Sequence, residues 1–227
     1  MLLLVTDTSG KHGFVGLVRA GAESQSDRLE VIEEVPLAGG TFSAQLVPQI
    51  AALLEKHRFR KTDIGAFVVV SGPGSFTGLR VGLAAIKALA EILQKPIVPV
   101  SLLEVVALAG ATDGKVMAAL DAGRGEVYIG EYEVRRGAAQ LVTEQLLPRA
   151  EFLSSEQGSV VATPDAALAE MARLAGLPVG SFDRVTAAMI ASLGWRKLRA
   201  GAVVSPEQLE ANYIRRSDAE IFAKPNC

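Results

Sequence analysis

The sequence has few residues of the types that form cross-links or bind metals. Its 227 residues include a single cysteine, Cys227, and two histidines, His12 and His57, which lie in separate segments. One cysteine excludes an internal disulfide framework and is typical of a reducing compartment, so we expect a cytoplasmic protein. A zinc site built from paired histidines on one helix needs a His-x-x-x-His spacing, which the chain lacks. We therefore predict no metal site.

Long apolar runs and an excess of one charge are also lacking. No apolar run approaches the roughly twenty residues that cross a bilayer. The first residues, MLLLVTDTSG, lack the basic region and cleavage site of a signal peptide. The formal net charge is −2, so no global electrostatic attraction draws the chain to nucleic acid. Because 49% of the residues are hydrophobic, we expect a soluble globular protein of one large or two small domains.

The most informative segment joins a strand to a helix through a glycine-rich turn. The letters VVVS, GPGSFTG and LRVGLAAIKALAEIL follow one another, which predicts a strand over 65–71 and a helix over 77–94. Glycine permits positive φ angles and close backbone approach, and Ser75 and Thr77 are both predicted as N-caps of the helix. Since amides at a helix N-terminus attract anions, the turn is a candidate phosphate site. The candidates are Gly72, Gly74, Ser75, Thr77 and Gly78, and the alternative is a purely structural tight turn.

The helix after this turn is apolar over most of its circumference. Its polar side chains are Thr77, Arg80, Lys87 and Glu91, and the last three fall on one line. A helix of this kind needs packing partners on more than one side. We expect one face to pack on the parent sheet and another on a second subunit, with burial inside its own domain as the alternative. The small residues that permit close approach are Gly78, Gly82, Ala84, Ala85 and Ala88.

The remaining patterns predict two halves of similar organisation. The first half is expected to hold strands 2–6, 13–19 and 28–35, helix 43–57, strand 65–71, helix 77–94, strand 97–100 and helix 102–109, the last capped by Ser101 with Glu104. The second half is expected to hold strands 115–120, 126–134 and 139–147, a short helix from Pro148, strand 159–162, helix 164–175 capped by Thr163, helix 184–200 ended by Gly201, and a tail with a short helix and an extended NYIRR segment. This order is typical of a ribonuclease H-like or actin-like domain with helices on both faces of a sheet.

Both halves open with an apolar strand that ends in an aspartate. Thr8 directly follows Asp7, and Gly123 and Gly125 lie two and four residues after Asp121. In a two-domain phosphate-binding fold, a carboxylate at each such strand end can face a shared cleft and hold a magnesium ion through water. Capping of the local turn is the alternative for each aspartate. Asp7 and Thr8 join the candidate residues near a nucleotide.

Five segments together resemble one family. The segments LVTDTSG, SGPGSFTGLRVGLAAIKALA, VSLLEVVA, AALDAGRGEVYIGEY and ANYIRR, which span nearly the whole chain, are similar to the TsaB/YeaZ family of bacterial tRNA threonylcarbamoyladenosine biosynthesis proteins. The resemblance implies an α/β, actin-like (ASKHA, ribonuclease H-like) fold of two domains with a reduced second domain. We place the domains at 1–103 and 104–227, with helix 184–200 as a candidate to pack back on the first.

The resemblance also implies a role. Members of this family are non-catalytic subunits that pair with the related TsaD and work with the ATPase TsaE, and the assembly transfers a threonylcarbamoyl group to the adenosine beside the anticodon in tRNAs reading ANN codons. We therefore expect no catalytic residue, no intrinsic cofactor, ATP or ADP only at the subunit junction, and tRNA contact only through the complex. The expected interface lies on helices 43–57 and 77–94, toward TsaD or, without it, a second copy. Its residues are Leu46, Ile50, Leu53, Val81, Ala84, Ala85 and Ala88.

The residues themselves agree with a chain that lacks chemistry of its own. No serine, histidine and aspartate set has plausible support, and both histidines are expected to face solvent. A small phosphotransferase or ATPase of the same fold is the alternative, but the stretch after Asp121 is short for a nucleotide-binding half. A nuclease of this fold is disfavoured because the strand before the glycine turn ends in Ser71, which is not a carboxylate. Phe42 stands where family members often carry a histidine, so we expect it to pack against the interface or the helix start.

Overall fold

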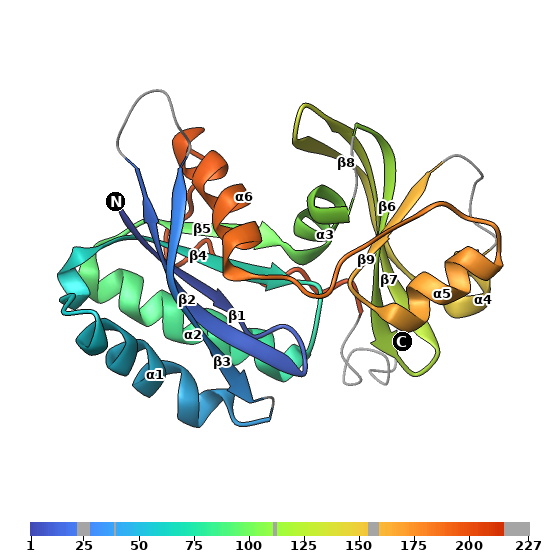
Figure 1. The fold of residues 1–227 in the computed structure, drawn as a ribbon. Coiled ribbons are helices and arrows are strands. Elements are labelled where there is room, and N and C mark those ends of the chain that lie inside the picture. Colours follow the sequence, from blue (N-terminus) through green and yellow to red (C-terminus); the bar gives the residue numbers. More distant parts are fainter. Residues whose placement is uncertain (22–27, 39, 111–112, 154–158, 216–227) are drawn as a thin grey trace, which may run out of the picture.

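The chain folds into two lobes, each built on a five-stranded mixed sheet (Figure 1). The computed structural model describes residues 1–21, 28–38, 40–110, 113–153 and 159–215. The first sheet has the strand order β3-β2-β1-β4-β5, and the second, read from its antiparallel edge, has the order β8-β7-β6-β9-β10. In both sheets an antiparallel meander of three strands is followed by two parallel strands. The two lobes therefore repeat one topology.

The helices that follow the meander are long in the first lobe and short in the second. The first half of the chain forms β1 (Leu2–Asp7), β2 (His12–Ala20), β3 (Leu29–Ala38), α1 (Phe42–Lys56), a 3-10 turn (Lys61–Asp63), β4 (Ile64–Gly72), α2 (Phe76–Leu93), β5 (Ile97–Ser101) and α3 (Leu102–Gly110). The second forms β6 (Gly114–Gly123), β7 (Glu126–Arg135), β8 (Ala138–Pro148), α4 (Arg149–Leu153), β9 (Val160–Thr163), α5 (Ala166–Leu174), β10 (Val179–Ser181) and α6 (Ala187–Arg199). Helices α4 and α5 have 5 and 9 residues, whereas α1 and α2, at the same places in the topology, have 15 and 18.

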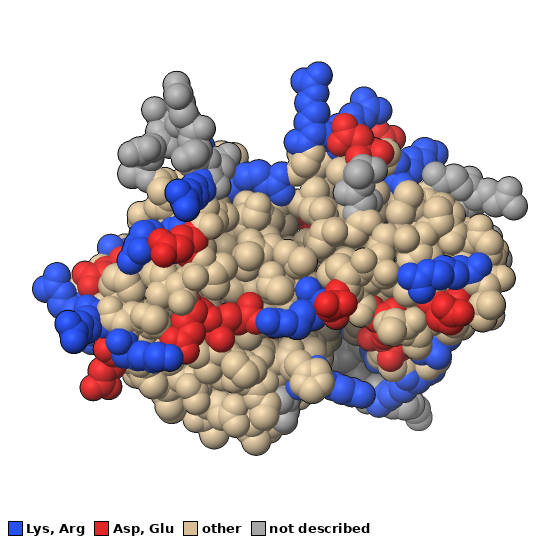
Figure 2. Space-filling model, viewed as in Figure 1, with Lys and Arg blue, Asp and Glu red and all other residues tan. Residues whose placement is uncertain are grey.

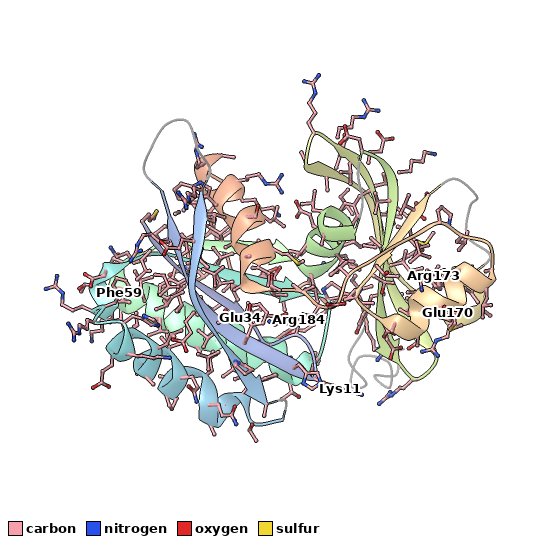
Figure 3. The ribbon with its side chains drawn as sticks, in the orientation of Figure 1. Lys11, Glu34, Phe59, Glu170, Arg173 and Arg184 are labelled. Carbon is pink, nitrogen blue, oxygen red and sulfur yellow. The ribbon has the colours of Figure 1, made fainter. Side chains whose placement is uncertain are left out.

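The last helix of each half packs on the sheet of the other lobe. Leu103 and Val106 of α3 lie in the core of the second lobe, and Ile190 of α6 lies in a core of the first. Glu34 of β3 holds the start of α6, because it pairs with Arg184 and accepts a hydrogen bond from the Ala187 amide at 2.7 Å (Figure 3). The chain therefore passes from the first lobe to the second before α3 and returns to the first lobe before α6.

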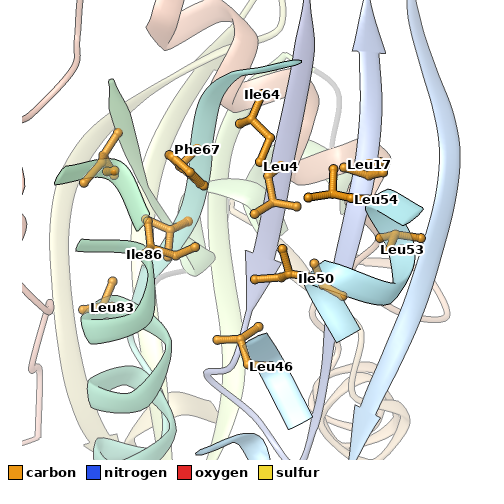
Figure 4. Close-up of a cluster of buried hydrophobic side chains, with 14 of the residues drawn as sticks. Leu4, Leu17, Leu46, Ile50, Leu53, Leu54, Ile64, Phe67, Leu83 and Ile86 are labelled. Carbon is orange, nitrogen blue, oxygen red and sulfur yellow. The ribbon is translucent and has the colours of Figure 1, made fainter. Parts of the chain in front are cut away.

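The first sheet is covered on both faces, with α1 and α2 on one and α6 on the other. Leu46, Ile50 and Leu53 are 1%, 4% and 2% exposed and pack with Phe67 and Ile86 (Figure 4). Their helical spacing points them toward the sheet of their own lobe. The prediction that these three residues line an interface is therefore wrong for this fold, because the chain's own core already encloses them. Phe42 is buried in the same core, at the start of α1.

Several local predictions need correction. Helix α5 is capped by Asp165, whose side chain accepts from the amides of Ala167 and Leu168, and not by Thr163. The short strand β10 was not predicted, because its three residues carry no readable period. His57 does not simply face solvent, since its Nε2 lies 2.6 Å from a carboxylate oxygen of Glu33.

The tail also differs from the prediction. Residues 205–215 form neither a helix nor a strand, and Val204 makes an isolated bridge to Ile97. Cys227 lies outside the described residues. Among the described helices, none is both long and apolar enough to cross a membrane.

Candidate functional site

A cleft of about 900 Å³ lies between the two lobes. The first lobe contributes the β1–β2 turn with Ser9 and Lys11, together with the start of α2. The second lobe contributes the β6–β7 turn from Asp121 to Arg124, and the tail contributes Asn212 to Arg215. The structure therefore brings the glycine turn and the Asp121 turn, predicted separately, to one cleft. Lining residues among the predicted candidates are Gly74, Ser75, Thr77, Gly78 and Asp121.

Ser75 caps α2 at the edge of this cleft. Its Oγ accepts a hydrogen bond from the Gly78 amide at 3.3 Å, and its carbonyl accepts one from Leu79 at 2.9 Å. The Ser75 amide donates to the carbonyl of Ser9 at 2.6 Å, so the β1–β2 turn is fastened directly to the start of the helix. Thr77 is exposed in the first turn and is not the cap. Of the two predicted caps, only Ser75 serves as one.

The glycines of the turn face other parts of the chain's own backbone. A side chain at Gly78 would meet the main-chain oxygen of Thr8, and one at Gly74 would meet that of Ser9. Gly72 has a φ of +133° and lies against the main chain of Asn212. The absence of side chains thus lets the β1–β2 turn, α2 and the tail pack closely. Close packing of the backbone therefore accounts for the glycines, as the alternative of a structural tight turn predicts. Binding of a phosphate in the cleft remains a prediction.

Both aspartates cap the turns that follow them. Asp7 is 6% exposed, and its Oδ1 accepts hydrogen bonds from the Ser9 amide at 2.8 Å and the Ser9 hydroxyl at 2.6 Å. Asp121 accepts from the Gly123 amide at 3.1 Å and pairs with Arg149 at 3.0 Å. Within the described ranges, no group of three or more His, Cys, Asp or Glu residues is placed to hold a metal ion. The bonds observed are those of the capping alternative for each aspartate.

Burial raises the pKa of Asp7 above its ordinary value, and the two bonds from Ser9 offset only part of that effect. Because the folded-state pKa is raised, the contribution of Asp7 to stability is largest below the unfolded pKa and is lost as the pH rises through the folded pKa. Asp7→Asn keeps an acceptor for both Ser9 donors and cannot ionise. We therefore expect the melting temperature of D7N, relative to the parent, to increase as the pH rises from about 4 to 8.

Melting curves of both proteins across this pH range, at constant ionic strength, test the prediction. Asp121→Asn is the control, since Asp121 is half exposed and paired with Arg149. The prediction is contradicted if the difference in melting temperature between D7N and the parent does not change with pH, or if it decreases as the pH rises.

Aromatic and cationic side chains from the tail and α2 meet at the mouth of the cleft. The rings of Phe76 and Tyr213 lie 4.8 Å apart, and the Arg80 guanidinium lies 3.7 Å from the centre of the Phe76 ring. Arg80 also donates to the Tyr213 hydroxyl at 3.3 Å. Sequence reasoning missed the part that Asn212 to Arg215 play in the cleft. Their only signal was the motif ANYIRR, which says nothing about where the segment lies.

Helices α1 and α2 expose small and apolar residues on the side away from the sheet. We call this surface the α1–α2 face and define it by Ala44, Val47 and Ala51 of α1 with Ala84 and Ala88 of α2, all of which are exposed. Val81 and Ala85 are half-buried and pack against the core below. Figure 2 shows few charged side chains along the lower edge of the first lobe, where α1 and α2 begin.

Known proteins resemble this chain in sequence and in fold. The family model of TsaD, described as tRNA N6-adenosine threonylcarbamoyltransferase, matches residues 36–201. The structure of YeaZ from Pseudomonas aeruginosa matches with a TM-score of 0.71 and 26% identity, over 93% of this chain and 100% of that one. The Bacillus subtilis tRNA threonylcarbamoyladenosine biosynthesis protein TsaB is 33% identical over 155 residues. The chain belongs to the TsaB/YeaZ family. The predicted resemblance and the actin-like (ASKHA) fold are thereby confirmed.

The extent of the match varies among the relatives. The alignment with the Bacillus subtilis protein covers 67% of this chain and 65% of that protein, which is less than two thirds of its length. An uncharacterized protein of Mycobacterium tuberculosis is 30% identical over 207 residues, which is 91% of this chain and 90% of that protein. The structural match to YeaZ includes both lobes, since it covers 93% of this chain. The fold of the TsaB/YeaZ family therefore extends over the cleft and the α1–α2 face.

Proposed function

We propose that this chain is a non-catalytic scaffold subunit for threonylcarbamoyl transfer to the anticodon-adjacent adenosine of tRNAs that read ANN codons. Its membership of the TsaB/YeaZ family supports a part in tRNA threonylcarbamoyladenosine biosynthesis. The observation that carries the non-catalytic role is that both strand-end carboxylates already have partners within the chain. Asp7, which does not line the cleft, is buried against Ser9, and Asp121, which does, is bound to Gly123 and Arg149. A phosphotransferase needs such groups free to hold a metal or polarise a nucleophile.

The α1–α2 face is the surface that we propose for docking. Small residues such as Ala84 and Ala88 let two helices approach closely, and burial of Val47, which is 49% exposed, adds apolar area. The proposed partner is a TsaD-type subunit, whose family model also matches residues 36–201 of this chain. Without that partner, a second copy of this chain occupies the same face. TsaE-type ATPase and tRNA join through the complex, with ATP or ADP near the subunit junction.

A small ATPase or phosphotransferase is the second candidate, and the cleft of about 900 Å³ favours it because a nucleotide fits that volume. Reconstitution separates the two functions. Purified TsaD-type and TsaE-type proteins, tRNA, ATP and a threonylcarbamoyl donor are combined with and without this chain, and the modified nucleoside is measured by mass spectrometry. We expect product only when the chain is present.

The chain alone is the critical control. With tRNA, donor and ATP but no other protein, it is expected to give neither modified tRNA nor ADP above background. Brisk ATP turnover by the isolated chain would overturn the scaffold proposal and support the phosphotransferase. Full product formation without the chain would show that it is not a required subunit.

A further inference from the structure

We propose that residues Asn212 to Arg215, called the strap here, lock the two lobes at a fixed angle, so that the cleft does not open and close. The four residues line the cleft, and they contact the two lobes in turn. This inference does not depend on the proposed scaffold role, because it concerns the motion of the chain by itself. Folds of two lobes around a cleft commonly close by hinge motion, and a segment bonded to both lobes opposes such a hinge.

The strap is fastened to the first lobe by its backbone and by an aromatic contact. The Asn212 amide donates to the Ser71 carbonyl at the end of β4, at 2.7 Å. Gly72, which has no side chain, lets the main chain of Asn212 lie directly against this strand end. Tyr213 packs on Phe76 at the start of α2. The chain leading to the strap is anchored in the same lobe, because Leu209 is 1% exposed in its core.

The strap is fastened to the second lobe by side chains. Asn212 Nδ2 donates to Glu144 of β8 at 2.6 Å. Ile214 packs against the core of the second lobe, and Arg215 pairs with Glu126 of β7. Asn212 alone therefore bonds to both lobes: its backbone amide bonds to β4, and its side chain bonds to β8.

Glu144 gathers three donors at the junction of the lobes. Its Oε1 accepts from Ser101 Oγ of the first lobe and from the Tyr132 hydroxyl of the second, each at 2.6 Å, and its Oε2 accepts from Asn212. Burial, followed by the bond to Glu144, raises the pKa of Tyr132 far above its ordinary value, so the phenol remains a donor at all working pH values. Short bonds to a carboxylate are stronger than bonds between neutral groups. The junction is consequently a fully bonded polar centre rather than a loose hinge.

A second tie lies away from the strap. Arg196, near the end of α6, donates to the Gly137 carbonyl in the β7–β8 turn, at the top of Figure 1. Lys197 pairs with Glu104 of α3 at 2.6 Å. Because α6 packs on the first sheet and the β7–β8 turn belongs to the second, this tie also joins the lobes. A rotation of one lobe against the other about either tie would stretch the other tie. Two separate ties therefore support a fixed angle between the lobes.

The test measures the distance between the lobes in the full-length chain. Spin labels are placed at Lys61→Cys in the first lobe and Gln140→Cys in the second, both exposed, in a Cys227→Ser background, and the distance distribution is measured by double electron–electron resonance. We expect one narrow distribution in the parent. In Glu144→Ala it broadens or a second distance appears, and in Asn212→Ala, which deletes a single side-chain bond, it changes in the same sense.

Hydrogen exchange of the Asn212 amide gives an independent readout. This amide bonds to Ser71 in the first lobe, whereas Glu144 lies in the second. If the strap acts as one unit, Glu144→Ala accelerates the exchange of that amide about tenfold, the effect of losing a bond to a charged group. In Glu144→Gln the side-chain oxygen still accepts from Ser101 and Tyr132, and the side-chain amide donates to Asn212 Oδ1 once the side-chain amide of Asn212 is turned over, so slower exchange is restored.

Gln208→Ala is the matched control. Gln208 lies in the same tail, and its side chain accepts a hydrogen bond from the nearby Ser205 amide; within the described ranges it makes no bond to the second lobe. It should leave both readouts unchanged. The proposal is overturned if Glu144→Ala and Asn212→Ala keep the narrow parental distribution, even if the Asn212 amide exchanges faster, because the strap would then be a local contact that does not set the lobe angle. A broad distribution in the parent would also overturn it.

Discussion

Ala84→Arg is expected to abolish association of the chain with a TsaD-type partner and with a second copy of itself. Ala84 is exposed on α2, so arginine is accommodated in the free chain. In a close-packed apolar contact, the same side chain places an unpaired charge out of water, which costs about 3–5 kcal/mol. The dissociation constant is then expected to rise by more than about a hundredfold. Isothermal titration calorimetry measures it for the partner, and sedimentation velocity measures it for the homodimer.

Ala188→Arg is the matched control for this experiment. Ala188 is exposed on α6, which covers the opposite face of the first sheet from α1 and α2. The control should bind like the parent, and both variants should melt near the parental temperature. Ala84→Arg binding at parental affinity would show that the α1–α2 face is not the docking surface.

Ala85 is a poorer choice for the same test, although the sequence favoured it equally. It is half-buried and packs against the core formed by Leu83 and Ile86 with the sheet. Arginine at this position disturbs the chain's own packing as well as any interface, so loss of binding would have two causes. The exposed positions Ala84 and Ala88 separate the two effects.

The order of strands and helices was predictable because each element carries its own local signal. The alternating and continuous apolar runs marked β1 to β9, and the three- and four-residue spacing of Leu46, Ile50 and Leu53 marked α1. Ser75 was a correct helix cap, because capping depends only on residues within one turn. The short strand β10 had too few residues to show a period.

The partner of each buried residue was not predictable from the same signals. An apolar stripe on α1 shows that Leu46 and Ile50 are buried, but not whether their own sheet or a second protein buries them. The carboxylates posed a similar question: Asp7 at a strand end suits a metal site and a turn cap equally, and only the positions of the Ser9 donors distinguish them. The strap has no periodic pattern, so its path across both lobes could not be predicted from the sequence.

Gly78→Ala is expected to destabilise the fold, although alanine normally favours a helix. The new Cβ would meet the main-chain oxygen of Thr8, which cannot rotate away, and would approach the Phe42 ring at 3.3 Å. Overpacking of this kind costs about 3 kcal/mol, against a gain of about 1 kcal/mol in helix propensity. A net loss of about 2 kcal/mol lowers the melting temperature of a chain of this length by about 4–8 °C, which thermal unfolding measures.

Two further variants identify the cause of that loss. Gly10→Ala lies in the neighbouring turn with its nearest atoms at 3.8 Å, so it should leave the stability unchanged or slightly higher. Gly82→Ala clashes with the side chain of Thr8 rather than with its backbone, so a second change, Thr8→Ala, should relieve it. The same second change should not rescue Gly78→Ala. If Thr8→Ala rescues both variants, or if Gly78→Ala melts at the parental temperature, the close approach of backbones does not explain why the turn contains glycine.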